Sequence, residues 1–134
     1  MYKVEMNESS QETDFCWMWV SNGVLFVKYK PSLVMTVEVA KQMYYERLKF
    51  SNGISRPLLL DGRNFISMDR ATMKFYKTKE VIQYITAGAF LTGNALTSLA
   101  GNLFLTLEKP LIPTKLFTEE QKALEWLEKY KFLN

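Results

Sequence analysis

Two aspartates near the middle of the chain, at a predicted strand end and a predicted helix start, are candidates for binding a cation or sharing a proton. Asp61 follows the apolar run at residues 57–60, and Asp69 begins a predicted helix. The carboxyl ends of strands are where α/β proteins place ligands, so the two carboxylates could bind a cation or share a proton at one rim of a sheet. The simpler interpretation, which we favour, makes Asp61 a turn residue and Asp69 a helix cap.

Polar and basic side chains around Asp69 form a second candidate site. Backbone N–H groups at the start of a helix attract anions, and arginines add positive charge there. A phosphate or an acidic segment of a protein partner could therefore dock. The alternative is an ordinary solvated loop. The residues of this predicted partner or anion site are Arg63, Asn64, Ser67, Asp69 and Arg70.

The chain contains no histidine, which excludes several kinds of catalytic and metal site. Serine–histidine and cysteine–histidine nucleophile pairs are impossible, as are metal sites built on imidazole. Cys16 lies in an apolar run between Phe15 and Trp17, so we predict a buried structural thiol and not a nucleophile. No phosphate-binding loop or dinucleotide fingerprint occurs. We therefore predict no catalytic, cofactor-binding or metal-binding residues and no enzyme; only an activity based on Asp61 or Asp69 stays open.

Trp17 and Trp19 indicate a possible contact surface. They alternate with Met18 on a predicted strand at residues 15–20, so both faces of that strand are large and apolar. Either the strand is covered on both faces, or one face meets a partner. In the second case Trp17 and Trp19 form a self-association surface, and the protein is a homo-oligomer.

Length and composition predict one folded domain. The 134 residues are 48% hydrophobic and 14% aromatic, enough to build a core without disulfides. The net charge of +3 comes from lysines interleaved with glutamates, so we expect no nucleic-acid partner. A single cysteine fits a reducing compartment, and the first residues lack the apolar core of a signal peptide. We therefore expect a cytoplasmic protein.

Residues 81–107 contain no charged side chain, which raises the question of a membrane span. The stretch exceeds the roughly 20 residues that a span requires. However, Thr92-Gly93-Asn94 is a turn sequence, and polar residues are scattered through the rest. We favour a buried strand, a turn and a buried helix, with no membrane span. The same stretch suggests an alternative function, a small-molecule or lipid-binding module with an apolar pocket near residues 84–107.

Local signals predict the order of the elements. Asn22-Gly23 between two apolar runs is a strong hairpin signal. Thr36 is placed to cap the first helix, and Thr118 with Gln121 has the spacing of a capping box for the last one. The predicted elements are a hairpin at 15–20 and 24–29, helices at 36–50, 70–77, 96–107 and from 118, and strands at 57–60, 84–91 and 114–117.

This order predicts an α/β fold with a mixed, mostly parallel sheet of about five strands, in which an N-terminal β-hairpin is followed by α-β-α-β-α-β-α. Ala123, Trp126 and Leu127 share one face of the last helix with Tyr130, and this face should pack on the sheet. Residues 1–13 are predicted to be a frayed terminus or an edge strand, and residues 14–134 a single domain.

The element order resembles the STAS fold of anti-sigma-factor antagonists. The sequences of several segments resemble those of an uncharacterised bacterial family of small STAS/SpoIIAA-like proteins. The resemblance extends over residues 14–133 and implies the fold without supplying a reaction. The segments that carry it are residues 19–29, 46–53, 60–63, 113–118 and 123–127.

In the antagonists, a phosphorylatable serine follows a Met-Asp pair at the start of a helix. Here Met68 and Asp69 match that pair, and Arg70 occupies the place of the serine. The resemblance therefore implies a non-enzymatic regulatory or protein-interaction domain that lacks the usual phosphorylatable serine. Its partner would be an unknown protein or a second copy of the chain. Phosphorylation at Ser67 or Thr72 is a further possibility, because phosphate is favourable near a helix start.

Overall fold

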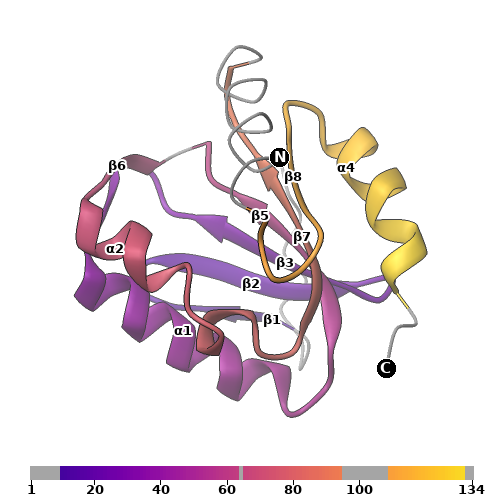
Figure 1. Ribbon diagram of the computed structural model, residues 1–134, viewed down its shortest axis with the longest axis horizontal. Coiled ribbons are helices and arrows are strands. Elements are labelled where there is room, and N and C mark those ends of the chain that lie inside the picture. The colour runs from indigo at the N-terminus through magenta and orange to yellow at the C-terminus, as the bar shows by residue number, and fades with distance from the viewer. Residues whose placement is uncertain (1–9, 64, 95–108, 132–134) are drawn as a thin grey trace.

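A six-stranded sheet forms the centre of the protein (Figure 1). The computed structural model describes residues 10–63, 65–94 and 109–131. Within them, the first three strands of the sheet pair antiparallel and the remaining pairs are parallel, which confirms the mixed, mostly parallel α/β fold. The strands, in their order across the sheet, are β1 (Ser10–Glu12), β2 (Cys16–Ser21), β3 (Val24–Tyr29), β5 (Arg56–Asp61), β7 (Ile85–Leu91) and β8 (Thr114–Phe117).

A second, two-stranded sheet was not predicted from the sequence. Its strands are β4 (Leu33–Met35) and β6 (Phe65–Met68), which pair parallel to one another. Strands of three and four residues are too short to show the alternation that identifies a strand. Because β6 leads into the next helix, this small sheet fixes where that helix starts.

The predicted hairpin between β2 and β3 is confirmed. Asn22 and Gly23 form its two-residue turn with φ angles of 49° and 79°. Positive φ at both turn residues matches the right-handed twist of the strands, and asparagine and glycine adopt it most readily. Ser21 pairs directly with Val24, so the turn sets the register of the whole pair.

The helices begin and end close to the predicted positions. The Thr36 hydroxyl accepts a hydrogen bond from the Val39 N–H at 3.3 Å, and Asn52 ends the first helix with a φ of 50°. The predicted helix at 96–107 lies outside the described residues. The described helices are α1 (Val37–Ser51), α2 (Arg70–Phe75) and α4 (Glu120–Leu127), with short 3₁₀ helices η1 (Glu80–Ile82) and η2 (Glu128–Tyr130).

The predicted capping box at the start of α4 is wrong. Glu119 is the N-cap residue, its side chain makes no capping hydrogen bond, and its carbonyl accepts from the Ala123 N–H at 3.2 Å. Since the helix starts one residue later than predicted, Thr118 and Gln121 do not stand at the two positions that a capping box joins.

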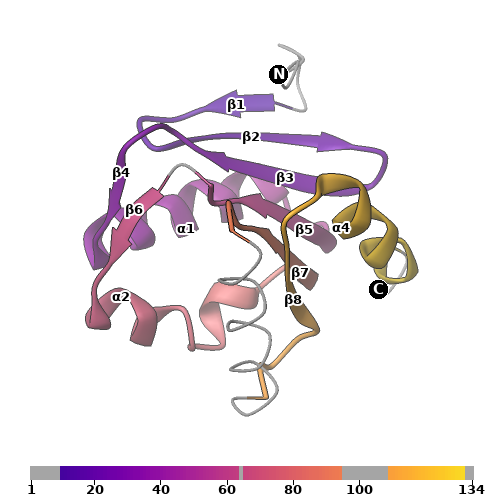
Figure 2. The ribbon, with the colours of Figure 1, turned by 90° about the horizontal axis from the view of Figure 1, so that it is seen from above.

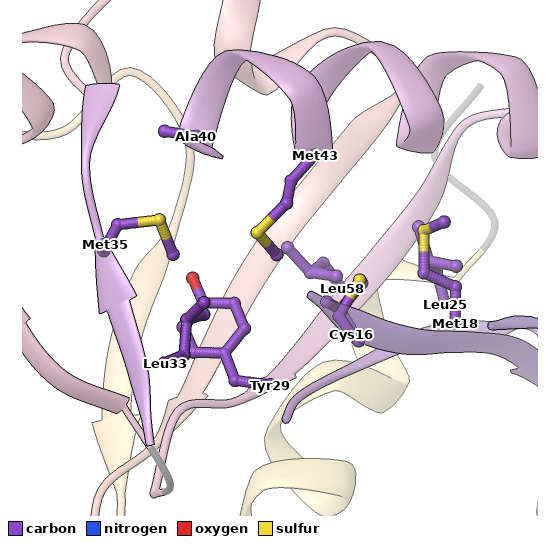
Figure 3. Packing of buried hydrophobic residues seen from close by; sticks show 10 residues of the cluster. Cys16, Met18, Leu25, Tyr29, Leu33, Met35, Ala40, Met43 and Leu58 are labelled. Carbon is purple, nitrogen blue, oxygen red and sulfur yellow. The ribbon is translucent and has the colours of Figure 1, made fainter. Parts of the chain in front are cut away.

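Helices cover both faces of the sheet (Figure 2). α1 and α2 lie on one face, where Cys16, Met18, Leu25 and Leu58 meet Met43 of α1 (Figure 3). α4 packs on the other face. Its Ala123 and Leu127 are fully buried against Ala87 and Ala89 of β7, while Trp126 and Tyr130 of the same helical face are half-buried at the margin. The alanines of β7 have small side chains, so α4 can lie close to the sheet.

Candidate functional site

Asp61 and Arg63 form an ion pair at the carboxyl end of β5. The Arg63 Nε donates to one carboxylate oxygen of Asp61 at 2.9 Å, and Nη2 donates to the other at 2.7 Å. The aspartate side chain is 3% exposed and that of the arginine is 40% exposed. Such a two-pronged pair orients both groups. The Asp61 carboxylate is thereby balanced by a guanidinium, and this argues against a cation site there.

Asp69 caps α2, as predicted. One of its carboxylate oxygens accepts from the Thr72 N–H at 2.8 Å and from the Thr72 hydroxyl at 2.6 Å. These two hydrogen bonds lower the pKa of the exposed Asp69 carboxyl. The carboxylate therefore already accepts from the N–H group that an incoming anion would use. Thr72 is fully buried, so its hydroxyl is not accessible for phosphorylation unless α2 opens.

Arg70 is the first residue of α2 and is exposed. The position that the resemblance aligns with the antagonists' serine is therefore the first residue of this helix. Two exposed apolar side chains belong to the same part of the fold. Met73 on α2 is 48% exposed, and Val34 on β4, the partner strand of β6, is 52% exposed. We call the side chains of Val34, Asp69, Arg70 and Met73 the β6–α2 surface.

The other predicted partner-site residues are not all brought together. Ser67 lies on β6 opposite Val34 in the register, so its backbone belongs to the β6–α2 region. Arg63 is engaged with Asp61. Asn64 lies outside the described residues. In the part of the chain that the structure describes, no three acidic or cysteine side chains gather as a metal site would require.

The two tryptophans of β2 differ in exposure. Trp19 is 8% exposed and stacks on Phe26, with ring centroids 5.1 Å apart and an interplanar angle of 9°. Trp17 is half-buried, and the Lys30 Nζ lies 5.2 Å from the centre of its ring. Met18, on the opposite face, is 1% exposed, so the strand is covered on both faces at Met18 and Trp19. A self-association contact would depend chiefly on Trp17 and stays a prediction.

The thiol of Cys16 lies in the hydrophobic core between the sheet and α1, with the Thr13 hydroxyl 3.5 Å from its sulfur. It is 1% exposed, and burial raises its pKa to about 11. Nearby, the Tyr29 hydroxyl points toward Met35 (Figure 3), and the Tyr76 hydroxyl donates to the Met35 sulfur at 3.7 Å. Burial raises the pKa of both tyrosines, that of Tyr29 strongly. All of these groups are neutral near pH 7, as structural groups would be.

The uncharged stretch contributes a strand to the sheet. Ala87, Ala89 and Leu91 of β7 are packed against α4. Residues 95–107 of the predicted pocket segment lie outside the described residues. Over the residues that the structure does describe, no helix combines the length and the apolar character needed to cross a membrane.

Sequence reasoning did not single out Arg47, Ser51 or Arg56. Arg47 is 7% exposed, and its guanidinium donates to the carbonyls of Val81 at 2.7 Å and Gln83 at 2.8 Å. A local signal could have indicated that Arg47 is buried, because it stands on the helix face that carries the apolar residues of α1. Its partners are more than thirty residues away, which no local pattern reveals.

The described topology defines a SpoIIAA-like fold, and a solved structure is similar to it. This is the crystal structure of an uncharacterized protein of the DUF3478 family with a SpoIIAA-like fold, from Shewanella loihica PV-4. The two share 17% sequence identity and a TM-score of 0.57 over 88% of this chain and 90% of that chain. The likeness confirms the STAS/SpoIIAA-like fold.

The chain belongs to the family described as Domain of unknown function (DUF7793), which it matches over residues 18–131. No curated protein matches it. The family description names no function, so the function is argued from the site.

Proposed function

We propose that this protein is a non-enzymatic, STAS-like interaction domain whose β6–α2 surface binds a protein partner. The observation that carries the proposal is the exposed start of α2. Arg70 makes no hydrogen bond or ion pair within the described residues, and apolar Met73 lies exposed one turn further along the helix. An arginine beside exposed apolar side chains is the composition that protein interfaces favour.

The charge around α2 indicates the chemistry of the partner. Residues 69–80 include four basic side chains and two acidic ones. A partner segment with acidic side chains would complement this surface and would be attracted to it in solution. An anion held by the helix start alone is less well supported, since Asp69 caps a helix of only six residues.

The nature of the buried groups supports a role without catalysis. Cys16 has a raised thiol pKa, and Asp61 is balanced by Arg63. A nucleophilic thiol needs a lowered pKa or an adjacent base, and Cys16 is in neither setting. The Asp69 carboxylate is engaged as the cap of α2. The buried side chains of Asp61, Thr72 and Arg47 are each engaged in hydrogen bonds.

Affinity capture from the organism that encodes the chain tests the proposal. Wild type should recover a discrete protein partner, and Arg70→Glu and Met73→Asp should each lower its recovery at least about tenfold, or ~1.4 kcal/mol. Lys122→Glu, an equal charge change on exposed α4, should recover the partner as wild type does. Equal recovery by Arg70→Glu and Lys122→Glu would rule out the β6–α2 surface as the binding site.

A further inference from the structure

Two arginines and a serine gather where α1 ends and β5 begins. Arg47 and Ser51 lie one helical turn apart on the buried face of α1. Arg56 is the first residue of β5, and its backbone N–H donates to the carbonyl of Tyr84 at 3.2 Å. Arg47 donates to the carbonyl of Gln83, next to Tyr84. The segment that leads into β7 therefore connects the two arginines.

The side chain of Arg56 projects toward α1. Side chains alternate along a strand, and Leu58, two residues on, packs in the same cluster as Met43 of α1. Ile85, which pairs with Arg56 across the sheet, packs against that cluster as well. Leu59 belongs to the opposite face, under α4. Arg47, Ser51 and Arg56 thus lie on the same side of the sheet, near the amino-terminal end of β5.

This cluster carries unbalanced positive charge. Within the described residues, neither Arg47 nor Arg56 has a carboxylate within ion-pair distance. The two carbonyls that Arg47 contacts satisfy its hydrogen bonds without neutralising its charge. Burial accordingly lowers the pKa of the Arg47 guanidinium to about 10. A buried positive charge of this kind is stabilised by an anion placed beside it.

The cluster also holds buried donors that no described residue satisfies. The Ser51 hydroxyl belongs to a residue that is 1% exposed, and neither this hydroxyl nor the Arg56 Nη1 has a hydrogen-bond partner. Buried polar groups almost always have a partner. Here two such groups, on different elements, lie on the side of the sheet that α1 covers, where Arg47 is also buried.

We propose that Arg47, Ser51 and Arg56 form a binding site for a small oxyanion, a phosphate or carboxylate group. Arg56 would bind it with its guanidinium fork, the Ser51 hydroxyl would donate a further hydrogen bond, and the charge of Arg47 would be balanced. Arg56 is half-buried, so one side of it meets solvent, from which the anion would enter. The site shares no residue and no helix or strand with the β6–α2 surface. The proposed anion site can therefore fail its test while the proposed function holds, and the reverse.

Calorimetric titration of the full chain with inorganic phosphate, and separately with acetate, tests the site. Arg56→Gln should weaken phosphate binding at least tenfold, and Ser51→Ala should weaken it less. Lys122→Gln is the matched control, since it removes one positive charge from an exposed side chain of α4, on the opposite face of the sheet, and it should change the affinity less than twofold. Binding of acetate as well as phosphate would extend the site to carboxylates, whereas binding of phosphate alone would restrict it to phosphate groups.

A melting curve separates loss of the site from loss of the fold. The Arg56 side chain makes no hydrogen bond with the described residues, so without phosphate Arg56→Gln should melt at or above the wild-type temperature. Phosphate should raise the melting temperature of wild type more than that of the variant. The proposal is overturned by absence of phosphate binding in the millimolar range, by equal affinity of wild type and Arg56→Gln, or by an equal loss in Lys122→Gln.

Discussion

Replacing Arg47 by methionine removes the connection between α1 and the segment before β7. The wild-type guanidinium is 7% exposed and donates to the carbonyls of Val81 and Gln83 at 2.7 and 2.8 Å. Methionine has a similar length and fills irregular space, so the change tests the hydrogen bonds more than the packing. The two carbonyls lose their charged donor in the variant.

The expected loss follows from these two bonds. Hydrogen bonds to a charged group contribute about 1.5–3 kcal/mol each. Burying the guanidinium costs free energy in the wild type, and the variant avoids this cost, which offsets part of the loss. We therefore expect Arg47→Met to lower the free energy of unfolding by about 3 kcal/mol. With an unfolding entropy of about 2.1 cal/mol/K per residue, this corresponds to a melting temperature about 10 °C lower.

Urea unfolding followed by circular dichroism measures the loss, and hydrogen exchange at residues 81–84 locates it. Lys41→Met is the matched control, because it removes the same charge from an exposed position of the same helix and should change stability by less than about 0.5 kcal/mol. A change below that size for Arg47→Met as well would refute the inference that this arginine holds η1 and β7 against α1.

Three further predictions concern the turn, the cap and the thiol. Gly23→Ala should lower the free energy of unfolding in urea by about 1 kcal/mol, because alanine is strained at the positive φ of this position. No clash adds to this loss, since the new Cβ would lie 3.7 Å from the Lys131 side chain, an ordinary contact distance. Hydrogen bonds lower the pKa of Asp69 in the folded state, so its contribution to stability is present above its ordinary pKa and is lost as the pH falls through the folded value. Melting temperatures between about pH 2 and pH 6 should therefore fall less steeply for Asp69→Asn than for wild type. Cys16 should react with a thiol reagent at pH 8 at least about 100-fold more slowly in folded protein than in urea, since its pKa is raised to about 11; equal rates would contradict its burial.

The elements that could be predicted from sequence are those whose signals are local. Asn22-Gly23 fixes the hairpin, Thr36 caps α1 and Asp69 caps α2, because each acts on residues within a few positions of itself. The start of α4 was misplaced by one residue, since Thr118 offered a cap that the chain does not use. Pairing of β4 with β6 joins segments thirty residues apart and left no local pattern.

The candidate site could be predicted only in part for the same reason. The Asp69 cap and the exposed Arg70 follow from neighbouring residues. The pairing of Asp61 with Arg63 depends on how the chain turns after β5, so Asp61 was expected to be a turn residue and Arg63 a member of the partner or anion site. Arg47 depends on contacts 34 and 36 residues away, which only the folded chain brings together.

Photo-crosslinking in living cells tests the central claim most directly. A photoreactive amino acid placed at position 73, on the β6–α2 surface, should yield one discrete adduct with a second protein. The same amino acid at position 122, exposed on α4, should not yield that adduct. The account predicts that Arg70→Glu removes the adduct formed from position 73. Absence of any adduct from position 73, or the same adduct from both positions, would contradict it.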